Sequence, residues 1–285
     1  MNEDMVSFII PARTEKYLNN TINDILNKAE TTFEILVVLD GYPDNYNYQK
    51  VDDPRVKYIS FPLPIGNERR KRQAVNAAVS ISKGKFVCWL DAHCVVAPGF
   101  DVTLVNDCED NMVITPKRYN MNLKAWDKGS EADNYRYFIW QCVRKGAFKQ
   151  YKWDRRAAER KDIMIDDIFA TQGSLFFMTR KWFDKMRFMK VEGYMGWGQE
   201  GEEIALTTIF NGGRMVVDKN TWYAHLSKSQ MPEKMYVAVS SKPSFDYCYN
   251  YWVNEQRDFF RKLINKYSPI PNWPENWEEI LDEEK

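Results

Sequence analysis

Histidine, cysteine and long apolar runs are all scarce in this chain. Of its 285 residues, two are histidines and five are cysteines, and no two cysteines have Cys-x-x-Cys spacing. An odd number of cysteines without that spacing favours reduced thiols, and therefore the cytoplasm, over a disulfide framework. No run approaches the roughly 18 to 20 apolar residues that a membrane-spanning helix needs, and no secretory signal precedes the first apolar segment. We expect a cytoplasmic protein without a membrane span.

An excess of either charge is also missing. Lysine plus arginine and aspartate plus glutamate both number 40, so the formal net charge is zero. This balance argues against a protein that depends on wholesale neutralisation of phosphates, although local basic patches stay compatible with it. The content of 44% hydrophobic and 15% aromatic residues excludes a disordered chain. The length is sufficient for one large domain with an appendage.

Alternating strands and helices are expected over the first third of the chain. Apolar patterns predict strands over residues 8–11, 33–40, 56–61 and 85–91, and helices over residues 16–28 and 67–82. Such alternation is typical of an α/β fold with a doubly wound, mostly parallel central sheet. Ligands of these sheets bind beyond the carboxyl ends of the strands. Arg13, Asp40 and Asp91, which end or follow three of the strands, are therefore expected along one edge.

The remainder of the chain is less regular. A strand is predicted over residues 173–178 and a helix over 202–211, and residues 117–161 mix Lys and Arg with Tyr and Trp. Two interpretations of that basic and aromatic stretch stay open: an insertion that faces a substrate, or a pair of amphipathic helices with solvated charges. Beyond His225, a helix over 245–267 and a Pro-rich and Trp-rich tail predict an appendage, in which Trp273 and Trp277 pin the tail to the body.

Both histidines end segments that are suited to metal binding. Asp91 and His93 follow a buried-strand pattern, and His225 closes another strand-like stretch over residues 214–225. A carboxylate with two imidazoles suits Mn²⁺ or Mg²⁺ with open positions for a substrate phosphate. An ion-free surface loop is the alternative for a lone Asp-x-His pair, but here neither histidine is left over for another role. This combination indicates phosphate-ester or nucleotide chemistry.

Three motifs in order resemble those of GT-A fold glycosyltransferases of the family 2 type. Residues 91–94 read Asp-Ala-His-Cys and resemble the Asp-Ser-His-Cys of the polypeptide N-acetylgalactosaminyltransferase branch. Residues 197–203 read Trp-Gly-Gln-Glu-Gly-Glu-Glu and resemble its Trp-Gly-Gly-Glu-Asn-x-Glu loop, and Gly212-Gly213 follows at the right distance. His225 occupies the place of that branch's third metal ligand. The resemblance covers residues 5 to 228.

The resemblance implies a GT-A domain over residues 1–228, with a nucleotide-binding half over 1–96 and an acceptor half over 97–228 that contains the 117–161 insertion. Residues 229–285 are then the helical appendage predicted from the helix and the Pro-rich and Trp-rich tail. It implies a nucleotide-diphosphate sugar donor, UDP-sugar by default, with a divalent ion held by Asp91, His93 and His225. The donor-binding residues that it implies are Pro11, Arg13, Asp40, Arg72, Asn76, Asp91 and Trp197. For Arg72 a solvated basic helix start is the alternative, and for Trp197 a core tryptophan at a turn.

Glu200 and Glu203 are the candidate catalytic residues. Inverting enzymes of the resembled family usually carry Glu-Asp at this place, whereas this chain has Glu200-Gly201. Either Glu200 or Glu202 serves as base in an inverting displacement, or the reaction retains configuration and the departing phosphate oxygen accepts the proton. Resemblance to the retaining branch favours the second course, in which Glu200 positions a substrate hydroxyl. The Gln-x-x-Arg-Trp motif of processive polysaccharide synthases is absent.

The acceptor is the least determined part of the reaction. A glycan or a protein is the first expectation, and hydroxymethylated pyrimidines of DNA are the alternative, because aromatic faces in residues 117–161 could stack on bases. A further alternative is a non-catalytic carbohydrate-binding module. A nucleotidyltransferase is disfavoured, because no Gly-rich phosphate loop follows the first strand.

Overall fold

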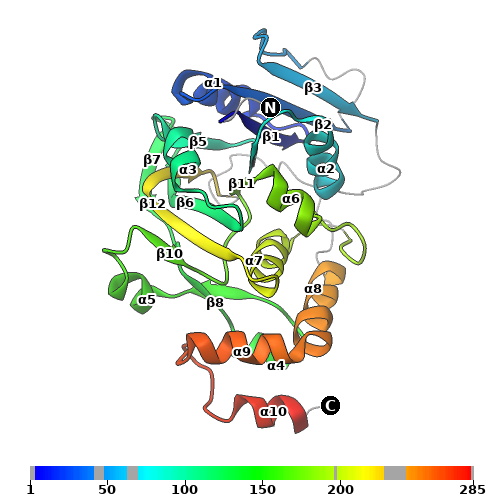
Figure 1. Cartoon of the computed structure of the whole chain (residues 1–285), viewed down its shortest axis with the longest axis vertical. Helices are drawn as coiled ribbons and strands as arrows, with labels where there is room; N and C mark the ends of the chain where they lie inside the picture. Colours follow the sequence, from blue (N-terminus) through cyan, green and yellow to red (C-terminus); the bar gives the residue numbers. More distant parts are fainter. Residues whose placement is uncertain (1–3, 42–47, 63–69, 196–197, 228–241, 284–285) are drawn as a thin grey trace.

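The computed structural model describes residues 4–41, 48–62, 70–195, 198–227 and 242–283. Ten of its strands form one sheet, whose main path runs β10-β12-β6-β11-β4-β1-β2-β3, with β5 on β12 and β7 on β6. The expected α/β class is confirmed, and Figure 1 shows the sheet with helices packed around it. No helix in the described ranges combines the length and the apolar character that crossing a membrane requires.

Four parallel strands make up one part of the sheet. β1 (Val6–Ala12) pairs with β2 (Phe33–Asp40) and β4 (Phe86–Leu90), and β3 (Val56–Phe61) pairs with β2. β2 and β4 are buried along their whole length, which fits apolar runs covered on both faces. Helices α1 (Leu18–Lys28) and α2 (Lys71–Ile81) connect these strands. The predicted alternation is confirmed, and residues 63–69, where the second helix was expected to begin, lie outside the described residues.

The other part of the sheet mixes both strand directions. β11 (Leu175–Thr179) lies antiparallel between β4 and β6 (Met112–Asn122), and β12 (Arg214–His225) runs parallel to β6. The antiparallel strands β5 (Cys94–Val96) and β10 (Ile165–Asp167) flank β12, and β7 (Asp127–Glu131) flanks β6. The parallel sense that the sequence predicted therefore holds in the first part of the sheet and is mixed in the second. Strand patterns in a sequence do not identify pairing partners, which explains the difference.

Side chains alternate between two apolar layers, one on each face of the sheet. Phe8 and Ile35 pack with α1 and with α3 (Phe100–Asp107), whereas Ile9 and Leu36 pack with α2, α6 (Arg180–Met186) and α7 (Glu200–Phe210). This alternation follows from the two-residue period of a strand. The layer that contains α7 also borders the site described below.

The basic and aromatic stretch over residues 117–161 is not a pair of amphipathic helices. It contains the C-terminal half of β6, strand β7, a two-stranded sheet of β8 (Arg136–Phe138) and β9 (Gln150–Lys152), and the short helices α4 (Trp140–Arg144) and α5 (Asp154–Glu159). Four of its aromatic side chains, Tyr135, Tyr137, Trp140 and Trp153, are only 4–7% exposed. The amphipathic helix pair is therefore wrong, because these aromatic rings form core rather than one face of a helix.

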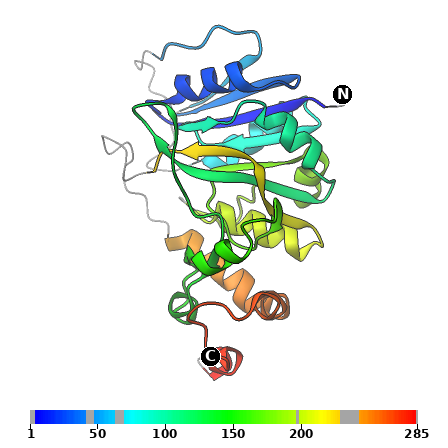
Figure 2. The same ribbon diagram turned by 90° about the vertical axis from the view of Figure 1, so that its left-hand side faces the viewer.

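The C-terminal helices pack against that two-stranded sheet. α8 (Lys242–Tyr249) continues through a π-helical turn (Asn250–Glu255) into α9 (Arg257–Tyr267), and α10 (Trp277–Glu283) ends the described chain. Both views place α9 and α10 at the end of the molecule farthest from β1–β3 (Figures 1 and 2). The indole of Trp273 donates a 2.7 Å hydrogen bond to the Phe138 carbonyl, and Trp277 is 4% exposed. The predicted pinning of the tail by tryptophans is confirmed.

Candidate active site

Asp91, His93 and His225 meet beside the carboxyl end of β4. Asp91 and His93 lie in the short connection between β4 and β5, and β5 pairs with the end of β12 so that His225 is opposite Cys94. Ligand atoms of the three side chains lie within 4.8 Å of one another. The Nε2 atoms of the two histidines are 3.1 Å apart, and Nε2 of His225 is 3.4 Å from Oδ2 of Asp91. The fold thus brings the three predicted metal ligands together.

Glu15 lies behind His93 and fixes the orientation of its ring. Oε2 of Glu15 is 3.2 Å from Nδ1 of His93, and both side chains are buried. In a neutral imidazole one nitrogen carries the proton and the other a lone pair. A proton on Nδ1, directed at Glu15, leaves the Nε2 lone pair facing Asp91 and His225. Carboxylates hold metal-binding histidines in this way, so the donor set fits a divalent cation.

Lys71 and Arg118 place positive charge beside this cluster. Nζ of Lys71 is 2.7 Å from Oδ1 of Asp91, and Nη2 of Arg118 is 3.5 Å from Nδ1 of His225. Burial acts to raise the pKa of Asp91, but Lys71 and His225 outweigh it and hold that pKa below its usual value. Burial lowers the pKa of His225 to about 4. At neutral pH the carboxyl is therefore ionised and the imidazole neutral, as metal coordination requires.

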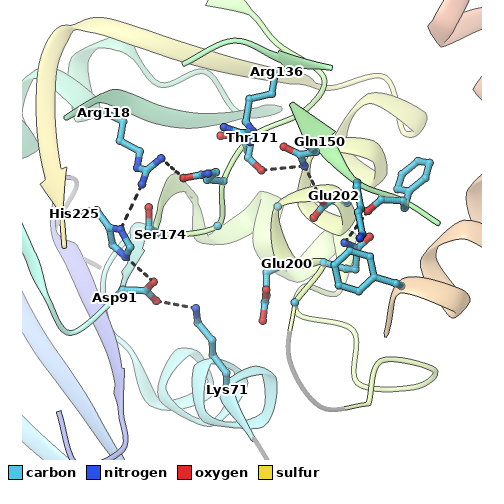
Figure 3. Close-up of a pocket in the computed structure, with 18 of the residues that line it drawn as sticks. Lys71, Asp91, Arg118, Arg136, Gln150, Thr171, Ser174, Glu200, Glu202 and His225 are labelled. Atoms are coloured by element: carbon cyan, nitrogen blue, oxygen red, sulfur yellow. Dashed lines mark hydrogen bonds and ion pairs between the residues drawn. The ribbon is translucent and has the colours of Figure 1, made fainter. Parts of the chain in front are cut away.

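A cavity of about 490 Å³ opens beside the cluster (Figure 3). Lys71, Asp91 and His225 line one part of it, and residues 171–174 form a wall. Arg136, from β8, lines another part of the cavity together with Gln150 and Glu202. The volume lies within the range of small-molecule sites, and the lining combines cations with hydrogen-bonding groups. Such a site can hold a metal-bound diphosphate together with the group that the diphosphate carries.

The sequence match decides the family. Residues 7–187, more than half of the chain, match the sequence model of the family "Glycosyl transferase family 2". The chain belongs to glycosyl transferase family 2. This match spans β1 through α6, and it includes Asp91 and His93 but ends before His225.

Two known proteins are similar to this family 2 chain. The uncharacterized glycosyltransferase MJ1057 of Methanocaldococcus jannaschii is 28% identical over 106 residues, which are 34% of this chain and 35% of that protein. The crystal structure of GalNAc-T7 with UDP, GalNAc and Mn²⁺ has a TM-score of 0.67 and 18% identity, and covers 98% of this chain and 55% of GalNAc-T7. The chain thus matches about a third of the first protein's length and about half of the second's. The structural likeness confirms the predicted GT-A fold.

Glu200 is the first residue of α7, and it points into the cavity beside Lys71 (Figure 3). Its carboxylate favours the charged form of Lys71, and helix N-termini in turn favour carboxylates. The next residue of this family 2 chain is Gly201. A Cβ at residue 201 would lie 2.3 Å from the Thr171 carbonyl oxygen. The backbone therefore leaves no space at residue 201 for the aspartate that the resemblance to inverting enzymes would place there.

Glu202 lines the same cavity and is buried beside Gln150. Nε2 of Gln150 donates hydrogen bonds to Oε1 of Glu202 at 2.6 Å and to the Thr171 carbonyl at 3.2 Å. Burial raises the pKa of Glu202 to about 7. This carboxyl can therefore both accept and donate a proton near neutral pH, which is the property of a general acid or base.

Arg72, Asn76 and Glu203 are placed behind the cavity, not among its described lining residues. Arg72 and Glu203 form a buried ion pair, and Nη1 of Arg72 also donates to the Lys190 carbonyl at 3.0 Å. The Asn76 amide exchanges hydrogen bonds of 2.8 and 2.7 Å with the backbone of Met189. These side chains fasten α2 to α7 and to the segment that precedes it. Their contacts are those of positioning residues.

Arg13 and Asp40 share the edge of the sheet as predicted, but they contact each other. Oδ2 of Asp40 accepts from Arg13 at 2.5 Å, and its Oδ1 accepts from Arg70 at 2.6 Å. The two arginines present their charge at the end of β2, where donor contacts were expected. Pro11 lies within β1, paired with Val38.

Trp197 lies outside the described residues. The structure adds Glu15, Lys71, Arg118 and Gln150 to the residues of the site. Sequence patterns gave no sign of Glu15 or Gln150, whereas Arg118 belongs to the basic and aromatic stretch for which a substrate-facing insertion was one of the two interpretations. Lys71 was visible as one member of the basic run over residues 69–72.

Proposed function

We propose that this chain is a metal-dependent glycosyltransferase that moves a sugar from a nucleotide-diphosphate sugar to an acceptor hydroxyl. The carrying observation is the convergence of Asp91, His93 and His225 within 4.8 Å beside a 490 Å³ cavity. Bound there, Mn²⁺ or Mg²⁺ supplies Lewis-acid stabilisation of the charge on the leaving diphosphate. UDP is the first nucleotide to test, since GalNAc-T7 was crystallised with it.

In the proposed reaction, the bond between the anomeric carbon and the diphosphate oxygen breaks, and a bond from the acceptor oxygen to that carbon forms. Lys71 and Arg118 bind next to the developing negative charge, where their fixed cations lower its energy. Glu200, at the start of α7, positions a hydroxyl of the donor or the acceptor. The acceptor proton leaves as the new bond forms.

We propose that the configuration is retained and that the departing phosphate oxygen takes the acceptor proton. The support is the lack of room for a side chain at Gly201, because the Thr171 carbonyl occupies the region that a base side chain would need. Glu202 is the alternative base for an inverting course, because its pKa of about 7 suits proton transfer. The anomeric configuration of a product, read by NMR coupling constants, separates the two courses.

The proposed acceptor is a glycan or a protein side chain. Most of the aromatic side chains of the 117–161 stretch, which would have supported stacking on DNA bases, are buried in the core, and Tyr151 is the large exposed ring among its described residues. We keep the proposed division into a nucleotide-binding half over 1–96, an acceptor half over 97–228 and an appendage over 229–285. Trp197 stays a proposed donor-binding residue, and so do Pro11, Arg13 and Asp40.

The decisive experiment measures the thermal stability of the protein with a panel of nucleoside diphosphates, with and without Mn²⁺. A ligand that binds only the folded state raises the unfolding temperature by mass action. We expect a base-selective rise that requires Mn²⁺ and disappears in His93→Ala, but persists in the control Glu159→Ala on the exposed surface of α5. No rise with any nucleotide would contradict the donor site.

Donor hydrolysis separates an enzyme from a binding module of the same fold. We expect slow release of nucleoside diphosphate from the donor in water alone, and faster release with acceptor. Glu200→Gln should reduce transfer with little change in donor affinity. Full transfer rate in that variant would contradict the role given to Glu200.

A further inference from the structure

Two arginines in the cavity have little negative charge to balance them. The Arg118 guanidinium contacts the amide oxygen of Gln172 and a ring nitrogen of His225, neither of which is anionic. Arg118 is only 9% exposed, and its Nε has no hydrogen-bond partner in the described part of the protein. A buried guanidinium without a carboxylate is costly unless a ligand supplies the missing charge.

Arg136 lines the same cavity from β8. Its side chain is 12% exposed, its Nη1 is 3.3 Å from Oδ2 of the half-exposed Asp133, and its Nε lacks a partner among the described residues. An ion pair of this kind at the rim contributes little. Burial lowers the pKa of Arg136, and the charge of Arg118 acts in the same direction. The two guanidinium groups therefore repel each other across a shared space.

The position of this pair follows from the proposed function, on which the inference rests. The metal ligands and Lys71 mark the place of the diphosphate, so the transferred sugar lies close to it, along the wall of residues 171–174. Figure 3 shows Arg118 and Arg136 on the side of the cavity opposite Lys71. A substituent of a sugar bound at this wall can reach both arginines.

The carboxyl groups near Arg136 limit the negative charge that such a sugar substituent can carry. Glu202 and Asp133 already bring some negative charge to Arg136, so a dianionic phosphate would be repelled more strongly than a monoanion. The buried Oε1 of Gln150 is also unpartnered among the described residues and can accept a hydrogen bond from a sugar hydroxyl. Planar guanidinium groups pair well with planar carboxylates.

We propose that Arg118 and Arg136 together bind the carboxylate of a sugar acid, so that a hexuronic acid is either the transferred sugar or the acceptor. The carboxylate lies between the two guanidinium groups, and Gln150 accepts from a neighbouring hydroxyl. Arg118 also contributes to the diphosphate region, whereas Arg136 serves the carboxylate alone. Arg136 is therefore the residue to vary.

The test compares matched neutral and acidic sugars by calorimetry in the presence of Mn²⁺. One arm titrates UDP-glucuronate against UDP-glucose, and the other titrates methyl glucuronide against methyl glucoside on protein saturated with UDP. In one arm, we expect the acidic sugar to bind about tenfold or more tightly, as charge-assisted hydrogen bonds predict. Arg136→Gln and Arg136→Lys should bring the two affinities closer, while UDP binds as before.

The arm that shows the preference identifies the source of the carboxylate. Arg155→Gln, which removes an exposed arginine of α5, is the control and should keep the full preference. Equal affinities in both arms of the wild type would overturn the inference, and so would a preference that both Arg136 variants retain. Binding of UDP in those cases leaves the proposed function standing. No response to UDP or to any other nucleoside diphosphate contradicts the proposed function and removes the inference with it.

Discussion

At the scale of single residues, the proposed metal site includes a side chain that is not one of its three proposed ligands. Glu15 holds Nδ1 of His93, so that Nε2 faces Asp91 and His225. Without Glu15 the ring can turn or bind its proton on the other nitrogen. We predict that Glu15→Ala weakens Mn²⁺ binding about 10-fold to 100-fold, the usual effect of losing such a carboxylate.

This prediction is checked by Mn²⁺ titration of the protein saturated with UDP. Glu15→Gln, which retains an acceptor oxygen for Nδ1, should lose less affinity than Glu15→Ala. An unchanged affinity in both variants would show that the ring is oriented by its packing alone.

Glu202 makes stability depend on pH. Its pKa is about 7 in the folded protein against an ordinary 4.5. Between these values the folded state binds more protons than the unfolded state, so stability falls as pH rises through this range. The loss in the free energy of unfolding that comes from ionising Glu202 is absent below pH 4.5 and reaches up to about 3 kcal/mol above pH 7.

We predict that Glu202→Gln removes this dependence, because the amide oxygen still accepts from Gln150 and carries no charge. Urea unfolding at pH 5 and pH 8 measures the effect. From pH 5 to pH 8, the free energy of unfolding of the variant should rise by a few kcal/mol relative to that of the wild type. Parallel changes of wild type and variant would mean that Glu202 titrates normally.

At the scale of elements, a buried ion pair joins α2 to α7. Arg72 and Glu203 are buried, with side-chain exposures of 8% and 0%, and the charge of Glu203 outweighs burial to raise the pKa of Arg72. Removing one partner leaves a buried charge. We predict that Glu203→Ala costs about 3–5 kcal/mol of stability, measured by urea unfolding.

The control for this prediction is Glu159→Ala, which breaks the exposed pair with Arg155 and should cost less than about 1 kcal/mol. Adding Arg72→Met to Glu203→Ala should recover part of the loss, because the unpaired charge is then gone. A mild effect of Glu203→Ala on stability with a large loss of transfer would instead favour the catalytic role predicted from the sequence.

At the scale of the whole molecule, the C-terminal helices share a core with the body. Phe260 of α9 is 1% exposed, and its ring centroid lies 5.9 Å from that of Phe148 and 6.4 Å from that of Phe138. We predict that Phe260→Ala lowers the free energy of unfolding by about 3–5 kcal/mol, and that the whole chain still unfolds in a single transition with a lower midpoint. Near-ultraviolet circular dichroism and tryptophan fluorescence should report the same midpoint.

Tyr151→Ala, which removes a 52% exposed ring of β9, is the control and should leave that midpoint almost unchanged. Two separate transitions in Phe260→Ala, with Mn²⁺ and UDP stabilising only the later one, would mean that the appendage unfolds on its own.

Long apolar runs explain which elements were predicted well. The strands predicted over 33–40 and 56–61 have the bounds of β2 and β3, because continuous or alternating apolar residues specify a strand locally. β8, β9 and β10 have three residues each, too few for a period to be visible. The helix predicted over 245–267 is interrupted at 250–255, since the π-helical turn leaves the helical pattern almost unchanged.

The sequence alone determined the chemistry available at the site, since it held only two histidines and placed Asp91 and His93 at a strand end. Tertiary structure decided everything that depends on which face meets which. Arg72 and Asn76 do lie on one face of α2. Only the fold shows that this face contacts α7 and the segment before α7, and not the cavity. Pairing between β5 and β12 brings His225 to His93 across 132 residues of chain. Local patterns report periodicity, whereas contacts over such separations are set by the packing of the whole chain.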